Sequence, residues 1–368
     1  MSMKEIVANF KHPVAMAFGN PLLDVIISND DNNLVSKYNL TLDAQIELKE
    51  KDINQLCAEL TDESKIITRA GGSAQNTMRI LQKLCGDLNS SKMCVYYGGL
   101  GDDSRGKTLE KLVQAANIDA RYVIHSTLPT GICVSIIKGA YRTLAANIGA
   151  ASIFTLEDLK HLELPFNSVK VIYIEGFFIT HSLDVAKEVV KKAQERNIVT
   201  AFNLSATYIF KDHHAALCEM VGIAKIVFGN AKEMIALANS LNLEFENVTD
   251  IPFLLNNLKS VTISASNSLS SDWLSNDSIF VMTQGGADPA IIVWGQGCSA
   301  QVSPVKPRSP IIDTTGAGDS LVAGFLAGMI TGRDPKTCLE WGCKVASDVI
   351  TNLGVTLSDD LPFDFLEC

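Results

Sequence analysis

Short apolar, β-branched runs alternate with segments of helical periodicity along the second half of the chain. The run at 171–174 predicts a buried strand, and residues 183–196 follow it with apolar side chains on one helical face. Further strands are predicted at 199–203, 226–228 and 279–282, with a helix at 231–240. Strands separated by helices pair in parallel, so the sequence predicts an α/β fold with a mostly parallel sheet flanked by helices on both faces. Ligands bind such folds beyond the carboxyl ends of the strands.

Two segments depart from this alternation. The chain is β-rich and polar between residues 22 and 68, and strand-like runs flank Gly139 and Ala140 as in a hairpin. We expect both segments to form a small β-rich lid on the large domain. The predicted lid takes residues 22–68 and 121–147, and the large α/β domain takes 1–21, 69–120 and 148–368. A stretch rich in Ser and Asn, 260–278, predicts a flexible surface loop.

The composition excludes several classes of protein. The formal net charge of −10 disfavours nucleic-acid binding, which depends on Lys and Arg placed against the phosphates. No apolar run approaches the roughly 18 residues of a membrane helix, and the first residues lack the apolar core of a secretory signal. The cysteines are scattered without a CxxC pair, which favours reduced thiols. We therefore expect a cytoplasmic monomer with neither nucleic acid nor membrane as a partner.

The most specific motif is the string at 313–320, which leads into an apolar helix. Gly316, Ala317 and Gly318 form a turn of small residues that opens this helix. Backbone N–H groups at such a helix N-terminus bind anions. Asp319 follows the turn, where a carboxylate beside a bound phosphate orients an attacking hydroxyl. The alternative is that Asp319 only caps the helix.

A second string, at 101–108, satisfies the Walker A pattern and lies between a predicted strand and a predicted helix. Asp102 and Asp103 lie within this loop, where both carboxylates would repel a polyphosphate. The sequence also lacks a clean Asp at the end of a later apolar strand to hold magnesium. We therefore interpret the Walker match as coincidental.

Polar residues near the amino terminus are candidates for sugar binding. The strand predicted at 14–18 ends before Asn20 and Asp24, and a carboxylate can accept hydrogen bonds from two adjacent hydroxyls of a sugar. A turn made by Asn and Asp without a ligand explains the same residues. Residues 71–76 open the next helix with two glycines, which allow close backbone approach, and with Asn76 in the first turn. A plain helix start is the alternative there.

Three further segments are candidates for nucleotide binding. Arg142 follows the predicted hairpin, where a long cation can reach over a phosphate, although most exposed arginines have no such role. Asn230 and Glu233 follow a strand, and a glutamate there can hold magnesium through water, unless the two residues only cap the next helix. Thr283 and Gly285 follow another strand in a turn that can face a nucleotide.

Taken in this order, the motifs resemble the ribokinase-like family of sugar and nucleoside kinases over nearly the whole chain. The most specific element is the string at 313–326. Within the family, the chain is most similar to the kinases that phosphorylate adenosine. The strings that carry this similarity lie at 19–24, 71–76, 129–131, 142–147, 175–178 and 203–206. The resemblance implies a ribokinase-like fold and transfer of the γ-phosphoryl of ATP to the 5′-hydroxyl of adenosine, with ATP and Mg²⁺ as cofactors.

The resemblance also implies roles for individual residues. Asp319 is the implied catalytic base, the backbone of 316–318 is the implied anion hole, and Arg142 is the implied phosphate contact. The implied sugar contacts are Asn20, Asp24, Gly71, Gly72, Ser73 and Asn76. The implied purine contacts are Gln45, Cys133, Leu144, Ala146, Phe177 and Tyr208. The implied cofactor contacts are Asn230, Glu233, Thr283 and Gly285, with Glu233 near magnesium.

Two alternatives stay open at this point. The first is a ribokinase-like kinase that acts on another nucleoside or on a sugar. The second is a nucleoside-binding protein that kept the fold and lost the chemistry. The presence of Asp319 beside Gly316 and Gly318 argues against the second alternative.

Overall fold

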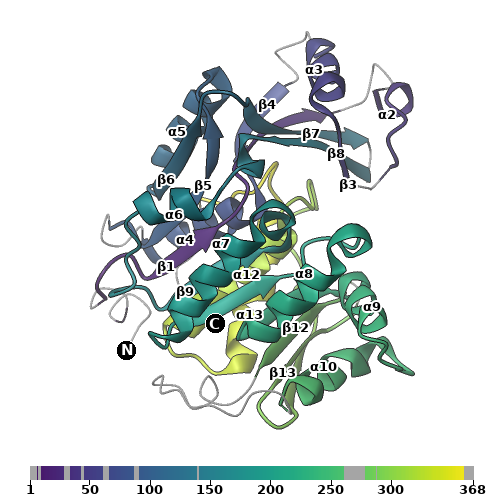
Figure 1. Ribbon diagram of the computed structural model, residues 1–368. Helices are drawn as coiled ribbons and strands as arrows, with labels where there is room; N and C mark the ends of the chain where they lie inside the picture. Colours follow the sequence, from purple (N-terminus) through teal and green to yellow (C-terminus); the bar gives the residue numbers. More distant parts are fainter. Residues whose placement is uncertain are drawn as a thin grey trace.

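Two β-sheets organise the chain in a computed structural model of the protein (Figure 1). The structure describes residue 6 and residues 10–28, 34–42, 45–60, 66–86, 91–138, 141–260, 278–286 and 288–359. Most of the larger sheet and its helices fill the lower part of Figure 1, while the edge of this sheet formed by residues 94–125 reaches the upper left, beside the smaller sheet at the upper right.

The larger sheet is mostly parallel, as the alternation of strands and helices predicts. Its strand order is β14-β13-β12-β11-β10-β9-β1-β5-β6, and every neighbouring pair from β12 to β6 is parallel. Strands β13 and β14 complete one edge in antiparallel pairing. The bounds are β1 (Ala15–Phe18), β5 (Cys94–Gly101), β6 (Asp119–His125), β9 (Val171–Glu175), β10 (Val199–Asn203), β11 (Ile226–Asn230), β12 (Ile279–Thr283), β13 (Ala290–Trp294) and β14 (Cys298–Val302).

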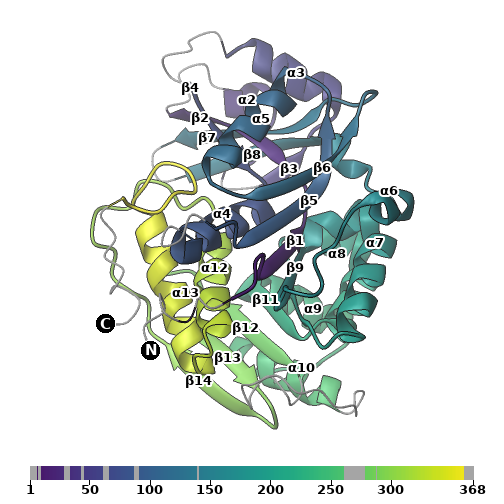
Figure 2. The same ribbon diagram turned by 90° about the vertical axis from the view of Figure 1, so that its left-hand side faces the viewer.

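Helices cover both faces of this sheet (Figure 2). Successive side chains of a strand point to opposite faces, so Tyr96 and Tyr173 enter one core while Tyr97 and Ile174 enter the other. The first core is formed with α4 (Ser73–Gly86), α5 (Ser104–Ala115), α12 (Ala317–Ile330) and α13 (Pro335–Val349). The second is formed with α6 (Leu156–His161), α7 (Gly176–Gln194), α8 (Ile209–Ile223), α9 (Ala231–Ser240) and α10 (Ile251–Ser260). Short 3₁₀ turns lie at η2 (Ala150–Ser152) and η3 (Val248–Asp250).

Several predicted elements are confirmed at their bounds. The strand predicted at 199–203 is β10, and the helix predicted at 231–240 is α9. Helix α7 begins at Gly176, before the predicted start at 183, but its backbone is non-helical at Ser182, so the predicted helix corresponds to the part of α7 after this kink. None of the helices that the structure describes combines the length and apolarity needed to cross a bilayer.

The smaller sheet has the strand order β3-β8-β7-β2-β4. Its strands are β2 (Leu22–Ser28), β3 (Gln45–Glu47), β4 (Ile66–Gly71), β7 (Thr130–Lys138) and β8 (Tyr141–Gly149). Two helices, α2 (Leu34–Lys37) and α3 (Glu50–Ala58), add Val35 and Ile53 to a separate core that also holds Val25 and Val134. The alternate residues of β2 and β7, among them the paired Asp24 and Cys133, lie on the opposite face of the sheet.

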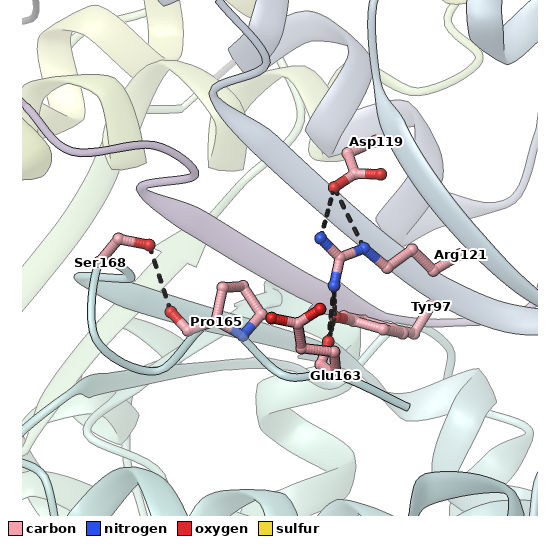
Figure 3. A network of polar contacts seen from close by, with 6 residues as sticks. All are labelled: Tyr97, Asp119, Arg121, Glu163, Pro165 and Ser168. Carbon is pink, nitrogen blue, oxygen red and sulfur yellow. Dashed lines mark hydrogen bonds and ion pairs between the residues drawn. The ribbon is translucent and has the colours of Figure 1, made fainter. Parts of the chain in front are cut away.

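The boundary predicted at residue 121 lies inside β6, which belongs to the larger sheet. Figure 3 shows the contacts that hold this edge strand. Arg121 Nη2 donates to Asp119 Oδ2 at 2.8 Å, and Arg121 Nη1 donates to the Glu163 carbonyl at 2.6 Å. Tyr97 Oη also donates to that carbonyl, at 2.6 Å. The sequence predicts residues 121–125 in the lid, but their parallel pairing with β5 makes them part of the larger sheet.

The predicted domain boundary at 69, the predicted hairpin and the predicted surface loop can be compared with the described residues. Residues 69–71 complete β4 of the smaller sheet, although they were assigned to the large domain. Strands β7 and β8 pair antiparallel as the hairpin predicts, while the turn at 139–140 lies outside the described residues. Almost all of the predicted loop at 260–278 also lies outside them.

Candidate active site

A cleft lies between the carboxyl ends of the parallel strands and the inner face of the smaller sheet. Strand ends of the larger sheet contribute residues such as Asn20, Asn203 and Asn230, and the smaller sheet contributes Asp24 and Leu144. The fold explains this position, because the carboxyl ends of parallel strands meet at one edge of the sheet.

All but two of the predicted site residues line this cleft. Gly71 lies behind it, where a Cβ atom would come within 2.0 Å of the Asp24 carboxylate. Gly71 therefore permits the close approach of β4 to Asp24. Gly285 lies apart from the cleft in an exposed turn, with a φ of +74°. The positive φ favours glycine in this turn with or without a bound nucleotide, so the predicted cofactor contact of Gly285 stays a prediction.

Sequence reasoning missed several residues of the cleft. Among them are Ile46, Glu47, Glu175, Asn203, Ser205, Thr314 and Thr315. The signal for Glu175 and Asn203 was available, since both are the last residues of their strands. Nothing local distinguishes Ile46 or Glu47, which reach the cleft through pairing of β3 with the distant strand β8.

The turn before α12 presents the helix N-terminus to the cleft. Gly316 adopts a left-handed conformation with φ +68°, and no side chain of the described residues caps the helix. A Cβ on Gly316 would lie within 2.4 Å of the Val355 side chain, so glycine is required for this turn to pack. Because the Ala317 N–H donates to the Thr314 carbonyl at 3.3 Å, the N–H groups of Gly318 and Asp319 are the better placed for an anion.

Asp313 supports this turn from behind. Its Oδ1 accepts from the Thr315 N–H at 2.8 Å, and its Oδ2 accepts from the Gly354 N–H at 3.0 Å. The carboxylate is almost fully buried, and it joins the turn to the segment that follows α13. The position of the helix N-terminus is thus fixed by two backbone contacts as well as by packing.

Asp319 points toward helix α4. Ser73 Oγ donates to its Oδ1 at 2.7 Å, and Asn76 Nδ2 donates to its Oδ2 at 3.0 Å. Burial raises the pKa of Asp319, while the bonds from Ser73 and Asn76 and the charge of Arg142 act in the opposite direction. These contacts are not those of a helix cap, because Asp319 lies inside the first turn and bonds to another helix.

The sequence predicts Asp24 beyond the end of a strand. In the structure, Asp24 instead lies inside β2, near the start of that strand. Burial raises its pKa to about 7, although the charge of Arg79 lowers it. The nearby Asn20 donates through Nδ2 to the Phe177 carbonyl at 3.0 Å. Its buried Oδ1 has no partner among the described residues. Asp24 and Asn20 both line the cleft, and each brings an acceptor oxygen to it or close behind its surface.

Glu175 is fully buried at the end of β9. Its two oxygens accept from the backbone N–H groups of Asn20, at 2.8 Å, and of Ala74, at 2.7 Å. Burial raises its pKa to about 7, and these two hydrogen bonds lower it. Glu175 therefore joins the end of β1 to the N-terminus of α4, which positions both segments of the cleft.

Asn230 and Glu233 form a capping box at the start of α9. The Asn230 side chain accepts from the Glu233 N–H at 3.0 Å, and Glu233 accepts from the Asn230 backbone N–H at 2.9 Å. Burial raises the pKa of Glu233 to about 7. The cap is therefore present, and Glu233 still lines the cleft. Among the described residues, no group of three or more His, Cys, Asp or Glu is placed to hold a metal ion.

The far end of the cleft is apolar and aromatic. The rings of Phe177 and Tyr208 lie with centroids 6.3 Å apart. Gln45 pairs with Leu144 across β3 and β8, and Ala146 follows on the same strand face. Such a pocket suits a flat, mostly apolar ring with a few polar atoms at its edge.

The Walker-like loop lies elsewhere and its helix N-terminus is filled. Asp103 Oδ1 accepts from the Gly106 N–H at 2.7 Å, and Asp103 Oδ2 accepts from the Thr130 N–H at 2.8 Å. Lys107 extends into solvent near Asp102, at 3.7 Å. The carboxylate occupies the position that a phosphate would need, so the structure agrees with a coincidental match.

Comparison with known proteins identifies the family. The sequence matches the profile of the pfkB family carbohydrate kinases over residues 33–362. The chain belongs to this family. It is therefore a phosphotransferase with an alcohol group as acceptor, and its fold is ribokinase-like, as the sequence predicts.

Curated relatives cover nearly the whole chain. Adenosine kinase 2 of Arabidopsis thaliana is 29% identical over 357 residues, which are 95% of this chain and 97% of that protein. The adenosine kinase of Saccharomyces cerevisiae is 30% identical over 351 residues, 92% of this chain and 95% of the relative.

Solved structures are similar over the same extent. The adenosine kinase of Schistosoma mansoni in complex with adenosine has a TM-score of 0.82 and 25% identity, covering 97% of this chain and 100% of the other. The adenosine kinase of Anopheles gambiae in complex with P1,P4-di(adenosine-5) tetraphosphate has a TM-score of 0.79 and 26% identity, covering 98% and 99%.

Proposed function

We propose that the protein transfers the γ-phosphoryl group of MgATP to the 5′-hydroxyl of adenosine, giving AMP and ADP. The observation that carries this proposal is the position of Asp319. Its carboxylate lies at an uncapped helix N-terminus and contacts Ser73 and Asn76, which open helix α4 beside Asp24. A hydroxyl held there is adjacent both to a base and to an anion site. The relatives named adenosine kinases support adenosine as the acceptor.

Phosphoryl transfer requires stabilisation of the negative charge on the phosphoryl group in the transition state. The N–H groups of Gly318 and Asp319 supply donors at the helix N-terminus, and Arg142 supplies a cation across the cleft. Asp319 orients the hydroxyl first and takes its proton late, because a carboxylate is a much weaker base than an alkoxide. Closure of the smaller sheet over the cleft would exclude water, which otherwise hydrolyses ATP.

Asp24 supplies the acceptor for the ribose hydroxyls, and the unpartnered Oδ1 of Asn20 supplies a second one. Two hydroxyl donors favour the ionised carboxylate, so adenosine binding lowers the pKa of Asp24 from about 7. Binding of adenosine therefore releases a proton near neutral pH, and affinity increases as pH rises through 7. The aromatic pair Phe177 and Tyr208 contacts the purine.

The residues of the cleft fit a magnesium ion held mainly by ATP. Among the residues known to line the cleft, Arg142 is the only Lys or Arg, whereas Asp24, Glu47, Glu175, Glu233 and Asp319 are acidic. A polyphosphate in this cleft needs a further cation, and Mg²⁺ commonly keeps several waters and one or two protein carboxylates. Glu233 is placed to hold such an ion through water, with Asn230 fixing its carboxylate. The ion would neutralise charge on the phosphates.

The test is ATP consumption by the purified protein with adenosine, with ribose and without an acceptor. Activity only with adenosine supports the proposal. Preference for ribose would identify a sugar kinase, and binding of adenosine without turnover would identify a non-catalytic nucleoside-binding protein. The matched variant Asp24→Ala sharpens the result. It should lower the preference for adenosine over 2′-deoxyadenosine, since a lost hydrogen bond to a charged group costs about 1.5–3 kcal/mol.

The compartment and the oligomeric state remain part of the proposal. The eight described cysteines are all free, in agreement with reduced thiols, and we propose a cytoplasmic monomer that acts in purine salvage. Gel filtration and the localisation of a tagged protein test these two points.

A further inference from the structure

Arg79 lies on helix α4, directly behind the residues assigned to the sugar. Its Nη1 donates to the Ala70 carbonyl at 2.8 Å and to Asn76 Oδ1 at 3.2 Å. Its Nη2 approaches the Val355 carbonyl at 3.4 Å. The guanidinium therefore contacts β4, the first turn of α4 and the segment that supports Gly316.

The hydrogen bond from Arg79 fixes the orientation of the Asn76 side-chain amide. A guanidinium has only donors, so the Asn76 atom against Arg79 must be the oxygen. The amide nitrogen then faces Asp319 Oδ2, to which it donates at 3.0 Å. In the opposite orientation, an amide oxygen would lie against the Asp319 carboxylate and two donors would face each other at Arg79. A short chain of hydrogen bonds thus runs from Arg79 through Asn76 to the proposed base.

Arg79 is also a principal positive charge near Asp24. Its charge lowers the pKa of Asp24 against the larger effect of burial, and the charge of Asp24 in turn raises the pKa of Arg79. The other charged and titratable groups near the two side chains come from β4, β6, β7, β8, the segment before α12 and the first turn of α12. They are Arg69, Tyr122, Cys133, Arg142, Asp313 and Asp319.

We propose that Arg79 is a positioning residue of the active site: its guanidinium orients the Asn76 amide toward Asp319 and places a positive charge near Asp24, the proposed acceptor of the ribose hydroxyls. This inference rests on the proposed function and assigns to Arg79 no direct contact with substrate. It predicts two separable defects when Arg79 is replaced. Loss of the Asn76 contact lowers kcat, and loss of the positive charge raises KM for adenosine at neutral and lower pH.

The experiment compares wild type with Arg79→Met, Arg79→Lys and the matched control Arg69→Met. Arg69 pairs with Asp24 across β2 and β4, but its guanidinium donates to the Thr68 carbonyl. In Arg79→Met, kcat/KM should fall roughly tenfold to a hundredfold, the effect of one hydrogen bond to a charged group. The acid limb of its pH profile should move to higher pH. Arg79→Lys should restore the pH profile, and Arg69→Met should resemble wild type.

A second measurement does not use turnover. Carbon-13 NMR follows the titration of the Asp24 carboxyl in the unliganded protein, with Asp24→Asn used for assignment. The midpoint near 7 should rise in Arg79→Met and remain in Arg69→Met. An unchanged midpoint together with wild-type kcat/KM would overturn the inference. An inactive wild type would overturn the proposed function instead, and the titration would still decide whether the charge of Arg79 acts on Asp24.

Discussion

Helices α12 and α5 both carry a glycine and an aspartate at their N-termini, yet the aspartates make different contacts. At α5, the Asp103 carboxylate folds back onto the Gly106 N–H at 2.7 Å and so caps the helix. At α12, the cap position is Gly316 and the aspartate, Asp319, bonds to α4 across the cleft. One helix N-terminus is filled by the protein itself, and the other is left for an anion.

The pKa values of Asp103 and Asp319 shift in opposite directions. Burial opposes ionisation of Asp103, but hydrogen bonds from Gly106 and Thr130 outweigh it and lower the pKa. Burial dominates at Asp319 and raises the pKa. By linkage, ionised Asp103 stabilises the fold above its usual pKa of 3.8, and this contribution disappears as pH falls through the lowered value. Ionised Asp319 is a cost to folding, which is typical of a group retained for chemistry.

The largest effect expected from this comparison is on Asp319→Asn. The amide keeps the size of the side chain but cannot take a proton, so kcat should fall by at least about 10²-fold. Adenosine affinity and the melting temperature should change little. Steady-state kinetics measure kcat, and calorimetry measures the affinity for adenosine. Turnover equal to wild type would remove Asp319 from the reaction.

Gly318→Ala tests whether the N-terminus of α12 is open. Nothing lies within 4 Å of a Cβ built on Gly318, so the fold tolerates the methyl group, which would project where the phosphate is expected. Activity should drop about tenfold or more, at unchanged stability. The matched control is Gly106→Ala, where the Cβ would lie 2.4 Å from the Gly101 carbonyl oxygen. Gly106→Ala should therefore lower the free energy of unfolding, whereas Gly318→Ala should not. A stable Gly106→Ala variant without activity, together with an active Gly318→Ala variant, would place the anion site at α5 and not at α12.

Asp103→Ala should act on stability and leave chemistry nearly unchanged. The variant loses a helix cap and leaves the Thr130 N–H without its acceptor, for a cost of about 2 kcal/mol in the free energy of unfolding. Denaturant unfolding at pH 7 measures this cost, and kcat of the folded fraction provides the control. A large loss of kcat at wild-type stability would contradict the structural role.

The sequence predicted more of the fold than of these contacts. Alternation of strands and helices placed β10 and α9 at their observed bounds, because buried parallel strands have a strong local signature. Residues at strand ends, such as Asn20, were found for the same reason. Asp103 capping of Gly106 is a local contact, three residues apart, but its second partner Thr130 is distant in sequence, and no local pattern could show that contact. Membership of 121–125 in the larger sheet likewise depends on pairing with β5.

Lys107→Ala should have the smallest effect. The ammonium is exposed and lies 3.7 Å from the exposed Asp102 carboxylate, and an ion pair of that kind contributes little. The value of kcat/KM for ATP should stay within about threefold of wild type. A collapse in ATP use by a folded variant would revive the Walker interpretation of this loop.

The claim that the phosphates bind at α12 and not at α5 is tested most directly by hydrogen exchange. Backbone amide exchange is followed by mass spectrometry with and without adenosine and a non-hydrolysable ATP analogue with Mg²⁺. We expect new protection in peptides covering Gly316 to Asp319, where the N–H groups of Gly318 and Asp319 are the better placed for an anion, and unchanged exchange at Gly106, which is already bonded to Asp103. Protection at 101–108 with none at 316–319 would contradict it.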